Sequence, residues 1–426
     1  PASPGVRRRD FLRTSSLALA APLLGRAQSP NPDDRIEVGF MGLNSRGSDL
    51  LKDFLASQRV LVTWLCDVDQ RAIDKASAIV RAAQTRPFKS TADFRRMLED
   101  RRLRAIVIAT PDHWHATATI EAAQAGKHAY VEKPLSHNPR EGEWIVEAAK
   151  RYRTVVQVGL QRRSVPWVQE AIARIHAGEL GPVHFARAWY AAKREGIGFG
   201  QLAPVPDWLN YSLWQGPAPE RPFRDNLVHY NWHWFWHWGT GELANNGVHF
   251  LDLARWGLRA DCPSRVASMG GRYYFDDDQE TPDTQVVTYD FGHCTLTWEH
   301  RSCQPQALEG EAAGVAFYGT QASLVLGLNA YRLLDRDGKE IARGGAATPT
   351  STHVANFLDC IENRGRPLAC NAEEGHRSTL LCHLGNIAHR VGEIIEVNPA
   401  TAQPRNSKAA ARLWSREYRK GWEPRV

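Results

Sequence analysis

The order of apolar and polar residues divides the chain into two parts with different periodicities. Over residues 33–160, short runs of consecutive apolar residues alternate with segments whose apolar residues recur at helical spacing. Strands of a parallel sheet that is covered on both faces read as near-continuous apolar runs. We therefore predict a doubly wound α/β domain. Its predicted strands are Ile36–Met41, Val60–Cys66, Ala105–Ala109, His128–Val131 and Thr154–Val158. Helical spacing covers Leu50–Leu55, Ile73–Ala83, Ala116–Ala125 and Arg140–Arg151.

Residues 161–395 follow a different pattern, in which apolar and polar residues alternate over short segments. Alternation with a period of two is typical of strands that bury one face only. Turn sequences at 290–292 and 335–338 separate these segments, and helical runs follow at 353–363 and 374–391. We predict an α+β domain with an open, largely antiparallel sheet, followed by a tail, 396–426, that wraps the surface. The predicted strands are Val286–Tyr289, Cys294–Trp298, Val315–Tyr318 and Ser323–Leu326.

Composition and charge exclude several classes of protein. The 426 residues are 43% hydrophobic and 23% charged, as in ordinary globular proteins rather than fibrous or disordered ones. Five arginines and one aspartate fall in residues 1–27, so this segment carries +4 of the net charge of +6. The nearly neutral remainder predicts no nucleic-acid partner. The longest apolar run, Leu17–Leu24, is shorter than the roughly 20 residues that span a bilayer, so no membrane insertion is expected.

The first 27 residues have the three parts of an export signal. Arg8 and Arg9 precede an apolar stretch, Leu17–Leu24, and Gly25-Arg26-Ala27 offers small residues for cleavage. A charged region, a short apolar region and a cleavage site are typical of a signal peptide, and the paired arginines indicate the route for folded proteins. We predict export to the periplasm or beyond, with a basic surface helix as the alternative.

The seven cysteines show neither a Cys-x-x-Cys pair nor a Cys/His zinc spacing. No metal site is therefore predicted from them. One disulfide among the later cysteines is compatible with an exported protein, but the sequence does not pair them.

A glycine-containing turn follows the first predicted strand. Dinucleotide-binding turns read G-x-G-x-x-G, and here Gly42 and Gly47 occupy the first and third positions. Asn44 stands at the second position, where its tolerance of positive φ suits the turn. Asp67 ends the second strand, where a carboxylate binds the ribose hydroxyls of NAD. The combination predicts a Rossmann domain that binds NAD.

Two alternatives to this interpretation of the turn remain open at the level of sequence. Ser45 and Arg46 directly follow Asn44, and together they offer a pocket for the 2′-phosphate of NADP. Asp67 is also placed to cap the helix that follows the second strand.

Two polar segments follow the next strands of the predicted sheet. Residues 110–115 read Thr-Pro-Asp-His-Trp-His, and residues 132–134 read Glu-Lys-Pro. Ligands of doubly wound sheets bind at the carboxyl ends of the strands, where both segments lie. With the later segment 239–252, Gly-Thr-Gly-Glu-Leu-Ala-Asn-Asn-Gly-Val-His-Phe-Leu-Asp, they make the chain similar to the glucose–fructose oxidoreductase / inositol dehydrogenase / MocA (Gfo/Idh/MocA) family over essentially all of residues 36–395.

The resemblance implies catalytic roles for three residues. Lys133 would hydrogen-bond the reacting hydroxyl and stabilise developing negative charge. His249 would accept the hydroxyl proton as a general base. Many members of the family carry Asp where this chain has Asn245, and an amide orients a neighbour without adding charge. Asp252, one helical turn after His249, is a candidate for the missing carboxylate.

The resemblance and the strand-end positions together define a predicted cofactor site. One of His113 and His115 is expected to face the cofactor, and the other to cap the following helix; Asp112 has a weaker case. The resemblance also implies that the sheet of the second domain forms a homo-oligomer, either a dimer or a tetramer. The predicted cofactor-binding residues are Gly42, Asn44, Ser45, Arg46, Gly47, Asp67, Thr110, Pro111, His115, Glu132, Lys133 and Gln161.

An aromatic segment, residues 229–238, carries Trp at four alternating positions, 232, 234, 236 and 238. If the segment is extended, all four indoles share one face and are suited to stack on pyranose rings. Packing in a core or an interface is the alternative. A metal site made of His233, His237 and His249 is a further alternative that no carboxylate or Cys spacing supports. The predicted substrate-binding residues are Lys133, Arg162, Tyr230, His233, His237, Asn245 and His249.

Three functions are compatible with these features. The first is an exported NAD-dependent oxidoreductase that oxidises a secondary hydroxyl of a sugar or glycoside, with C3 as the candidate position, and recycles a tightly held cofactor. The second is a redox-neutral glycoside-cleaving enzyme that passes through a 3-keto sugar and needs a base near C2, for which Tyr230, His233 and His237 are candidates. The third is a non-catalytic sugar-binding protein, against which Lys133 and His249 argue. We favour the first.

Overall fold

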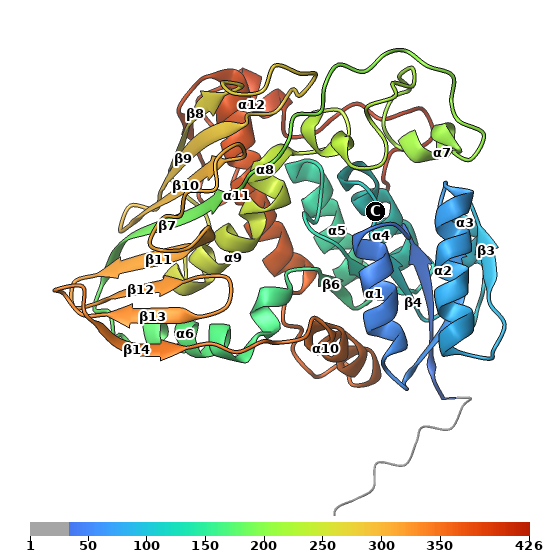
Figure 1. Ribbon diagram of the computed structural model, residues 1–426, viewed down its shortest axis with the longest axis horizontal. Coiled ribbons are helices and arrows are strands. Elements are labelled where there is room, and N and C mark those ends of the chain that lie inside the picture. The colour runs from blue at the N-terminus through green and yellow to red at the C-terminus, as the bar shows by residue number, and fades with distance from the viewer. Residues whose placement is uncertain (1–33) are drawn as a thin grey trace, which may run out of the picture.

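The computed structural model describes residues 34–426, so the predicted signal peptide, residues 1–27, lies outside the described residues. These residues form two sheets with helices between and around them (Figure 1). The first sheet has six strands in the order β3-β2-β1-β4-β5-β6, all parallel. Its strands are β1 (Ile36–Met41), β2 (Val60–Cys66), β3 (Lys89–Thr91), β4 (Ala105–Ile108), β5 (His128–Val131) and β6 (Val156–Val158).

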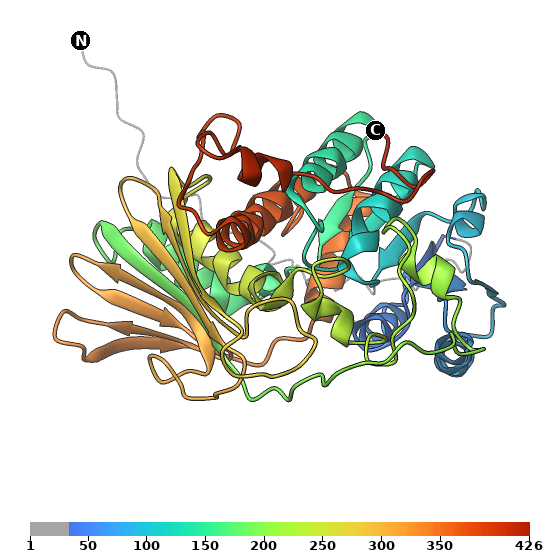
Figure 2. The same ribbon diagram turned by 90° about the horizontal axis from the view of Figure 1, so that it is seen from above.

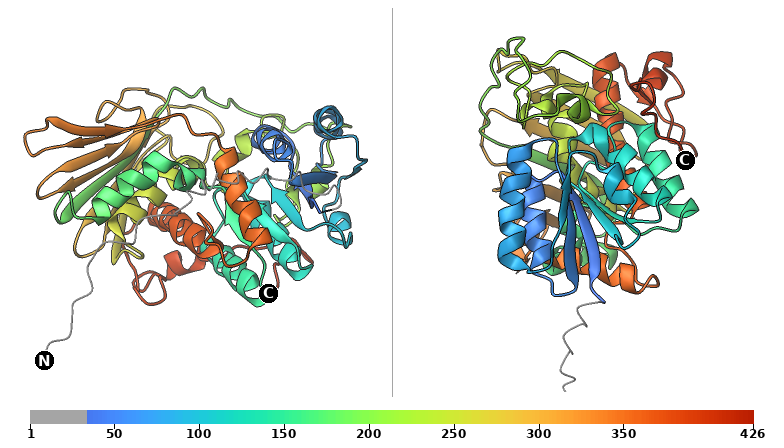
Figure 3. Two further views of the ribbon diagram at one scale, coloured as in Figure 1. Left: turned by 90° about the horizontal axis from the view of Figure 1, so that it is seen from below. Right: turned by 90° about the vertical axis from the view of Figure 1, so that its right-hand side faces the viewer.

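The first sheet is covered on both faces, as the run of buried residues in its strands requires. Helices α1 and α2 lie on one face, and α4 and α5 lie on the other (Figure 3, right). The predicted doubly wound fold is confirmed. The helices of this half are α1 (Arg46–Leu55), α2 (Gln70–Ala83), α3 (Arg95–Leu98), α4 (Asp112–Gln124) and α5 (Pro139–Arg151).

The second sheet has nine strands in the order β14-β13-β12-β11-β7-β10-β9-β8-β15. Only β7 and β10 pair in parallel, so the prediction of an open, largely antiparallel sheet is confirmed. Its strands are β7 (Val183–Ala191), β8 (Arg265–Gly271), β9 (Thr284–Asp290), β10 (Thr295–Arg301), β11 (Ala313–Gly319), β12 (Ser323–Leu326), β13 (Tyr331–Leu334), β14 (Glu340–Gly344) and β15 (Ile395–Glu396).

Helices cover one face of this second sheet, and the other face is open (Figure 2). Helix α11 contacts both α9 beneath the second sheet and α5 beside the first, so it joins the two halves. The helices of this half are η1 (Gln161–Ser164), α6 (Pro166–His176), α7 (Tyr211–Gln215), η2 (Asn231–Trp234), α8 (Gly241–Asn245), α9 (Gly247–Leu258), α10 (Ser351–Glu362), α11 (Ala372–Val391) and α12 (Lys408–Arg412).

Helix α10 belongs to the second half of the chain but packs on the first sheet. Val354, Phe357, Leu358 and Ile361 are buried in one cluster with residues of β1, β2, α1 and α2. The Phe357 ring meets those of Phe54 and Tyr130 edge to face, with centroids 6.2 and 5.8 Å apart. Helix α10 therefore completes the core that covers this face of the first sheet.

A long connection between β7 and α8 crosses back to the first domain (Figure 1). We call residues 204–233 of this connection the cover segment. The Trp208 carbonyl accepts the backbone N–H of Gln70 at 3.2 Å, and the Val68 carbonyl accepts that of Asn210 at 2.9 Å. The cover segment is thereby attached to the loop that follows β2.

Three findings within the described residues bear on expectations from the sequence. The seven cysteines, all of which lie in this part of the chain, are free thiols. No helix within residues 34–426 is long and apolar enough to cross a membrane. In the same range, His, Cys, Asp and Glu side chains do not gather in groups of three or more that would hold a metal ion.

Candidate active site

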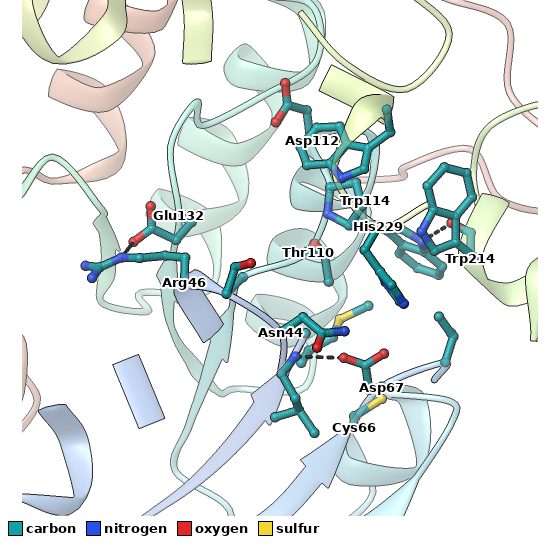
Figure 4. Close-up of a pocket in the computed structure, with 18 of the residues that line it drawn as sticks. Asn44, Arg46, Cys66, Asp67, Thr110, Asp112, Trp114, Glu132, Trp214 and His229 are labelled. Atoms are coloured by element: carbon teal, nitrogen blue, oxygen red, sulfur yellow. Dashed lines mark hydrogen bonds and ion pairs between the residues drawn. The ribbon is translucent and has the colours of Figure 1, made fainter. Parts of the chain in front are cut away.

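The largest concentration of predicted site residues lines one cavity at the carboxyl ends of the first sheet's strands (Figure 4). It encloses about 280 Å³. The glycine turn and the end of β2 form one side, the loops after β4 and β5 form a second side, and the cover segment closes it. The predicted residues that line it are Gly42, Asn44, Ser45, Arg46, Asp67, Thr110, Pro111, Glu132, Lys133, Tyr230, His233 and Asn245.

Close backbone approach makes glycine necessary at the turn. Gly42 has a φ of +86°, and a Cβ there would lie 2.5 Å from the Ala109 carbonyl oxygen. A Cβ on Gly47 would lie 2.1 Å from the Gly42 carbonyl oxygen. The other residue of the turn with a positive φ is Ser45, at 41°, rather than Asn44. The special tolerance that we assigned to Asn44 is therefore not what this turn uses.

Asp67 lies at the floor of the cavity, next to the turn. Its Oδ2 accepts the backbone N–H of Leu43 at 2.7 Å, and its Oδ1 accepts that of Asp69 at 2.9 Å. Burial raises the pKa of Asp67, and these two hydrogen bonds oppose that rise. The capping role belongs to the neighbouring Asp69, whose side chain accepts the Arg71 N–H at the start of α2. The carboxylate of Asp67 is thus fixed where ribose hydroxyls of a dinucleotide would lie.

Arg46 points away from Asp67. Its Nε donates to Oε1 of Glu132 at 2.8 Å, and Figure 4 shows this pair on the far side of the cavity from Asp67. An arginine committed to Glu132 is not placed to hold a 2′-phosphate beside the ribose. Together with the glycine turn at the N-terminus of α1, which suits a pyrophosphate, these residues fit NAD.

Lys133 and Asn245 meet at the opposite end of the cavity. The Lys133 ammonium donates to both the backbone oxygen and the Oδ1 of Asn245, each at 3.0 Å. Nδ2 of Asn245 lies 3.5 Å from Oε1 of Glu242, a buried carboxyl group. Burial raises the pKa of Glu242. The three side chains form a series, Lys133–Asn245–Glu242, in which the carboxyl group of Glu242 contacts the side-chain amide of Asn245, and that amide in turn contacts Lys133.

His249 lies at the start of α9 and is not among the residues that line the cavity. Burial lowers its pKa well below the usual value, and the charges of Lys133, Arg162 and Arg46 lower it further. Its Nδ1 is buried without a hydrogen-bond partner. A neutral imidazole of this kind is able to accept a proton.

Many members of the family carry Asp where this chain has Asn245, and Asp252 does not replace that carboxylate. Both of its oxygens bind the Arg163 guanidinium, at 2.8 and 3.0 Å, and one also accepts the Ser378 hydroxyl. The prediction for Asp252 is therefore wrong, because the residue belongs to a buried ion pair under the second sheet. The carboxyl group near Asn245 is that of Glu242, three residues earlier in the sequence.

Asp112, at the start of α4, lines the cavity and is fully enclosed. Burial raises its pKa to about 7, while the Thr240 hydroxyl, which donates to its Oδ2 at 2.5 Å, opposes that rise. His113 and His115 do not line the cavity. Nε2 of His113 bonds the Trp214 carbonyl at 2.9 Å, and both ring nitrogens of His115 bond backbone carbonyls. These contacts give both histidines structural roles.

The aromatic segment is not extended, because η2 turns the chain at Asn231–Trp234. Trp232 lines the cavity, where its ring stacks on His233 with centroids 3.6 Å apart. Trp234 and Trp238 are buried and do not line it. A single platform of four indoles is therefore not formed, and core packing accounts for two of them.

Several other predicted residues also lie outside the cavity. The Arg162 guanidinium donates to the carbonyl oxygens of Gly327 and Leu328 in the β12–β13 hairpin. Nε2 of His237 bonds the Pro219 carbonyl at 2.7 Å, and the residue lines a different cavity. The predicted contacts of these two residues with substrate are not supported by these positions. Gly47 and Gln161 likewise do not line the cavity.

Sequence reasoning missed the residues that close the cavity from above. Leu213, Trp214 and His229 come from the cover segment, and Trp114 comes from α4. No periodicity marks them, since the cover segment has little regular structure. Glu242 did carry a signal, because it lies one helical turn before Asn245 in the predicted catalytic segment.

Two family models match the chain. One is described as "Oxidoreductase family, NAD-binding Rossmann fold" and matches residues 36–160. The other is described as "Oxidoreductase family, C-terminal alpha/beta domain" and matches residues 188–424, more than half of the chain. The chain belongs to the Gfo/Idh/MocA oxidoreductase family. The predicted NAD cofactor is confirmed at the level of this family's NAD-binding domain.

Curated relatives match only a part of this family member. A "Glycosyl hydrolase family 109 protein" of Shewanella putrefaciens is 36% identical over 122 residues, 28% of this chain and 27% of its own length. The "Alpha-N-acetylgalactosaminidase" of Shewanella oneidensis is 32% identical over 171 residues, 34% of this chain and 37% of its own. The chain therefore spans about a third of the length of these relatives.

Solved structures match the fold over most of the chain. The WlbA dehydrogenase of Bordetella pertussis, in complex with NADH and UDP-GlcNAcA, has a TM-score of 0.65 at 19% identity, covering 85% of this chain and 99% of its own. The aldose-aldose oxidoreductase of Caulobacter crescentus, complexed with glycerol, has a TM-score of 0.66 at 17% identity, covering 85% and 100%. These similarities establish the fold of this family member.

Proposed function

We propose that this Gfo/Idh/MocA protein oxidises a secondary hydroxyl of a sugar or glycoside and keeps its NAD bound between cycles. The observation that carries the proposal is the shared cavity, in which the dinucleotide-binding residues and the Lys133–Asn245 pair face one another under the cover segment. Bound NAD would supply the hydride acceptor. The relatives named for sugars and glycosides support a carbohydrate as the substrate class.

The protein side chains have separable tasks in this proposal. Lys133, held by two hydrogen bonds to Asn245, donates to the substrate hydroxyl and stabilises the negative charge that develops on its oxygen. The resemblance to the family assigns the proton-accepting role to His249, which is neutral because burial lowers its pKa and which would act from outside the residues that line the cavity. Glu242 orients Asn245 from the side away from Lys133.

Retention of the cofactor is supported by the contacts of the cover segment. The Arg71 guanidinium lies 3.5 Å from the Trp208 ring, and the Trp208 ring also stacks on that of His229. Nε2 of His229 in turn bonds Oδ2 of Asp69 at 2.9 Å. We expect these contacts, which hold the cover segment over the cavity, to slow the release of a dinucleotide.

Redox-neutral cleavage of a glycoside is the second candidate, and the names of the curated relatives favour it. In this reaction C3 would be oxidised to a ketone, a base would remove the C2 proton, and the aglycone would be eliminated from C1. Water would then add across the C1–C2 double bond, and return of the hydride to C3 would give the free sugar. Tyr230 and His233 line the cavity and are candidates for the base at C2. Burial lowers the pKa of His233 to about 3, so its imidazole is neutral at physiological pH.

Export through the twin-arginine route remains part of the proposal. Residues 8 and 9 are the arginine pair, and residues 17–24 are the apolar stretch. A route that carries folded proteins delivers the enzyme with its cofactor already enclosed, which suits a compartment poor in free NAD. A fusion of residues 1–33 to a reporter, with and without Arg8→Lys and Arg9→Lys, tests it: loss of export with both substitutions is expected, and export that is unaffected would contradict it.

The central experiment measures nucleotide content and reaction type together. The protein is purified without added cofactor, one sample is denatured to identify the released nucleotide, and another is mixed with a panel of aryl glycosides and free sugars. Reduced nicotinamide formed in proportion to enzyme, without release of aglycone, supports the oxidoreductase. Turnover of aglycone without accumulated reduced nicotinamide supports the glycosidase. A protein that neither contains nor binds NAD would contradict both.

Lys133→Ala separates catalysis from cofactor binding. We expect turnover to fall by about a hundred- to a thousand-fold, as when other charge-stabilising groups are removed, while NAD content stays at the wild-type level. Lys339→Ala, at an exposed position between β13 and β14, is the matched control and leaves both quantities unchanged. Full turnover in Lys133→Ala would contradict the role of Lys133.

A further inference from the structure

A second cavity, behind the active site, is lined by an unusual number of basic side chains. It encloses about 610 Å³ and is built from the start of α5, the C-terminal half of α11, the loop after α7 and the chain after α12. Four arginines and three histidines line it, against two glutamates. The basic residues are Arg221, Arg390, Arg412, Arg416, His137, His237 and His383.

The guanidinium groups of this cavity are not neutralised by carboxylates. In the described part of the chain, no carboxylate oxygen lies within 4.0 Å of Arg390, Arg412 or Arg416. Arg221 reaches Oε1 of Glu280 only at 4.0 Å. Glu220, one of the two lining glutamates, is paired with Arg419 at 2.6 Å. A positive field is therefore left inside the cavity.

Hydrogen-bond donors in the cavity also lack acceptors. Nη1 of Arg416 donates to Nδ1 of His137 at 3.0 Å, which leaves the proton of this imidazole on Nε2. That Nε2 is buried and has no hydrogen-bond partner. Burial lowers the pKa of His137. Electrostatic repulsion from Arg416 and from three neighbouring histidines lowers this pKa further. The nearest carboxyl group is that of Glu141, which already accepts the His137 backbone N–H and the Tyr418 hydroxyl.

We propose that this second cavity binds an oxyanion, either free phosphate or sulfate or the acidic group of a small sugar acid. A buried donor without an acceptor and several arginines without counter-ions are both satisfied by one such group. The cavity is several times larger than a single ion, so it has room for a sugar ring attached to the charge. The proposal rests on this cavity and not on the function proposed for the first.

The second cavity adjoins the first through one residue. Thr240 lines the second cavity, and its hydroxyl donates to Asp112, which lines the first. An occupant of the second cavity therefore sits one side chain away from the active site.

Isothermal titration of the full-length protein tests the site. Inorganic phosphate, inorganic sulfate and glucuronate are the probes, and the Arg390→Gln variant is the control, because a neutral sugar is a proposed ligand of the first cavity. We expect saturable binding of at least one oxyanion by the wild type. Glucuronate bound at least about tenfold more tightly than the inorganic ions identifies a sugar acid, and equal affinities identify a free oxyanion. Binding of none of the three by the wild type would overturn the proposal.

Variants locate the binding. Arg416→Gln and Arg390→Gln are each expected to weaken oxyanion binding by about tenfold or more, as the loss of one charged hydrogen bond implies. Arg343→Gln, at an exposed position on β14, is the matched control and keeps wild-type affinity. If Arg416→Gln does not fold, the oxyanion affinities of Arg390→Gln and Arg221→Gln, variants of two other arginines that line the cavity, test the assignment. Wild-type affinity in Arg390→Gln and Arg221→Gln would place the binding elsewhere and overturn the assignment.

Discussion

Asp112 is a carboxylic acid enclosed between the start of α4 and the Thr240 hydroxyl. Burial raises its pKa from 3.8 to about 7. Because the folded-state pKa lies above the unfolded one, the folded protein binds this proton more tightly. The contribution to stability is fully present below about pH 4 and is lost as the pH rises through about 7. At neutral pH the group is thus poised between a donor and an acceptor inside the candidate active site.

Asp112→Asn removes this titration while it keeps an acceptor for Thr240. We expect the unfolding free energy of the variant to exceed that of the wild type at about pH 8, with a difference that shrinks toward about pH 4. A shift of about three pKa units sets the limit at about 4 kcal/mol. Urea unfolding at both pH values, on samples of equal NAD content, measures it. A difference that does not vary with pH would show that Asp112 titrates normally.

At this scale the sequence predicted the residues whose roles depend on their position along a strand. Gly42, Asp67 and Lys133 each follow a strand of the first sheet, and the carboxyl ends of parallel strands converge. Asp252 and His237 were misplaced because their partners, Arg163 and the Pro219 carbonyl, lie far away in the sequence. Helical spacing alone does not reveal such partners.

Among the elements, the cover segment has the clearest functional consequence. Trp208 is one of its contacts with the first domain, through the Arg71 guanidinium, and its ring also stacks on the ring of His229 within the cover segment. A cation over an indole contributes about 0.5–2 kcal/mol, and a ring stack contributes about 0.5–1.5 kcal/mol. Loss of both contacts weakens the closure of the cofactor cavity.

Trp208→Ala is therefore expected to release NAD more readily, by about tenfold or more in the dissociation rate. The measurement is nucleotide content after dialysis, together with the rate of exchange against a labelled cofactor. Leu202→Ala, at a side chain that is 71% exposed shortly before the cover segment, is the matched control. Equal retention of NAD in both variants would show that the cover segment does not govern release.

The elements themselves were predicted unevenly, for a physical reason. Strands β1, β2, β4 and β5 are buried on both faces, so each could be recognised in the sequence from its run of consecutive apolar residues. Strands β3, β7, β8, β13, β14 and β15 were missed. Of these, β3 is a polar segment of three residues at the sheet edge, and β8 ends in two glycines. Such strands are defined by their neighbours in the sheet rather than by their own pattern.

At the scale of the whole molecule, many buried histidines have a lowered pKa and so make the folded state sensitive to acid. Burial is the first cause of the lowered pKa in each of them. Their unfolded value is 6.5. The pKa is about 3 for His113, His233 and His383, and about 4 for His128, His237, His300, His353 and His376.

We expect a steep loss of stability below neutral pH. Because the folded-state pKa values are depressed, the unfolded chain binds more protons below about pH 6.5, so stability is present above that pH and lost as the pH falls. Each such histidine contributes up to about 1.4 kcal/mol per pH unit. The sum over several groups is comparable with the about 5–15 kcal/mol of a typical domain. Urea unfolding at about pH 7.5 and pH 5 measures the loss, and equal unfolding free energies would contradict it.

Oligomerisation through the second sheet remains a proposal. Its open face carries Met269 and Val286, which are 79% and 44% exposed. Light scattering of the purified protein is expected to give a dimer or a tetramer, as the resemblance to the family implies. Met269→Arg would then shift the protein toward monomers if this face is the contact.

The position of α10 has a consequence for how the protein can be divided. The chain leaves the first domain after β6 and returns to it near residue 351, where α10 supplies Val354 and Phe357 to the core of the first sheet. A fragment that ends between the two family domains would expose the apolar surface that these side chains cover. The nucleotide-binding domain is thus not a portable module of this chain: transplanting it into another protein, or expressing it alone, requires the distant helix to come with it.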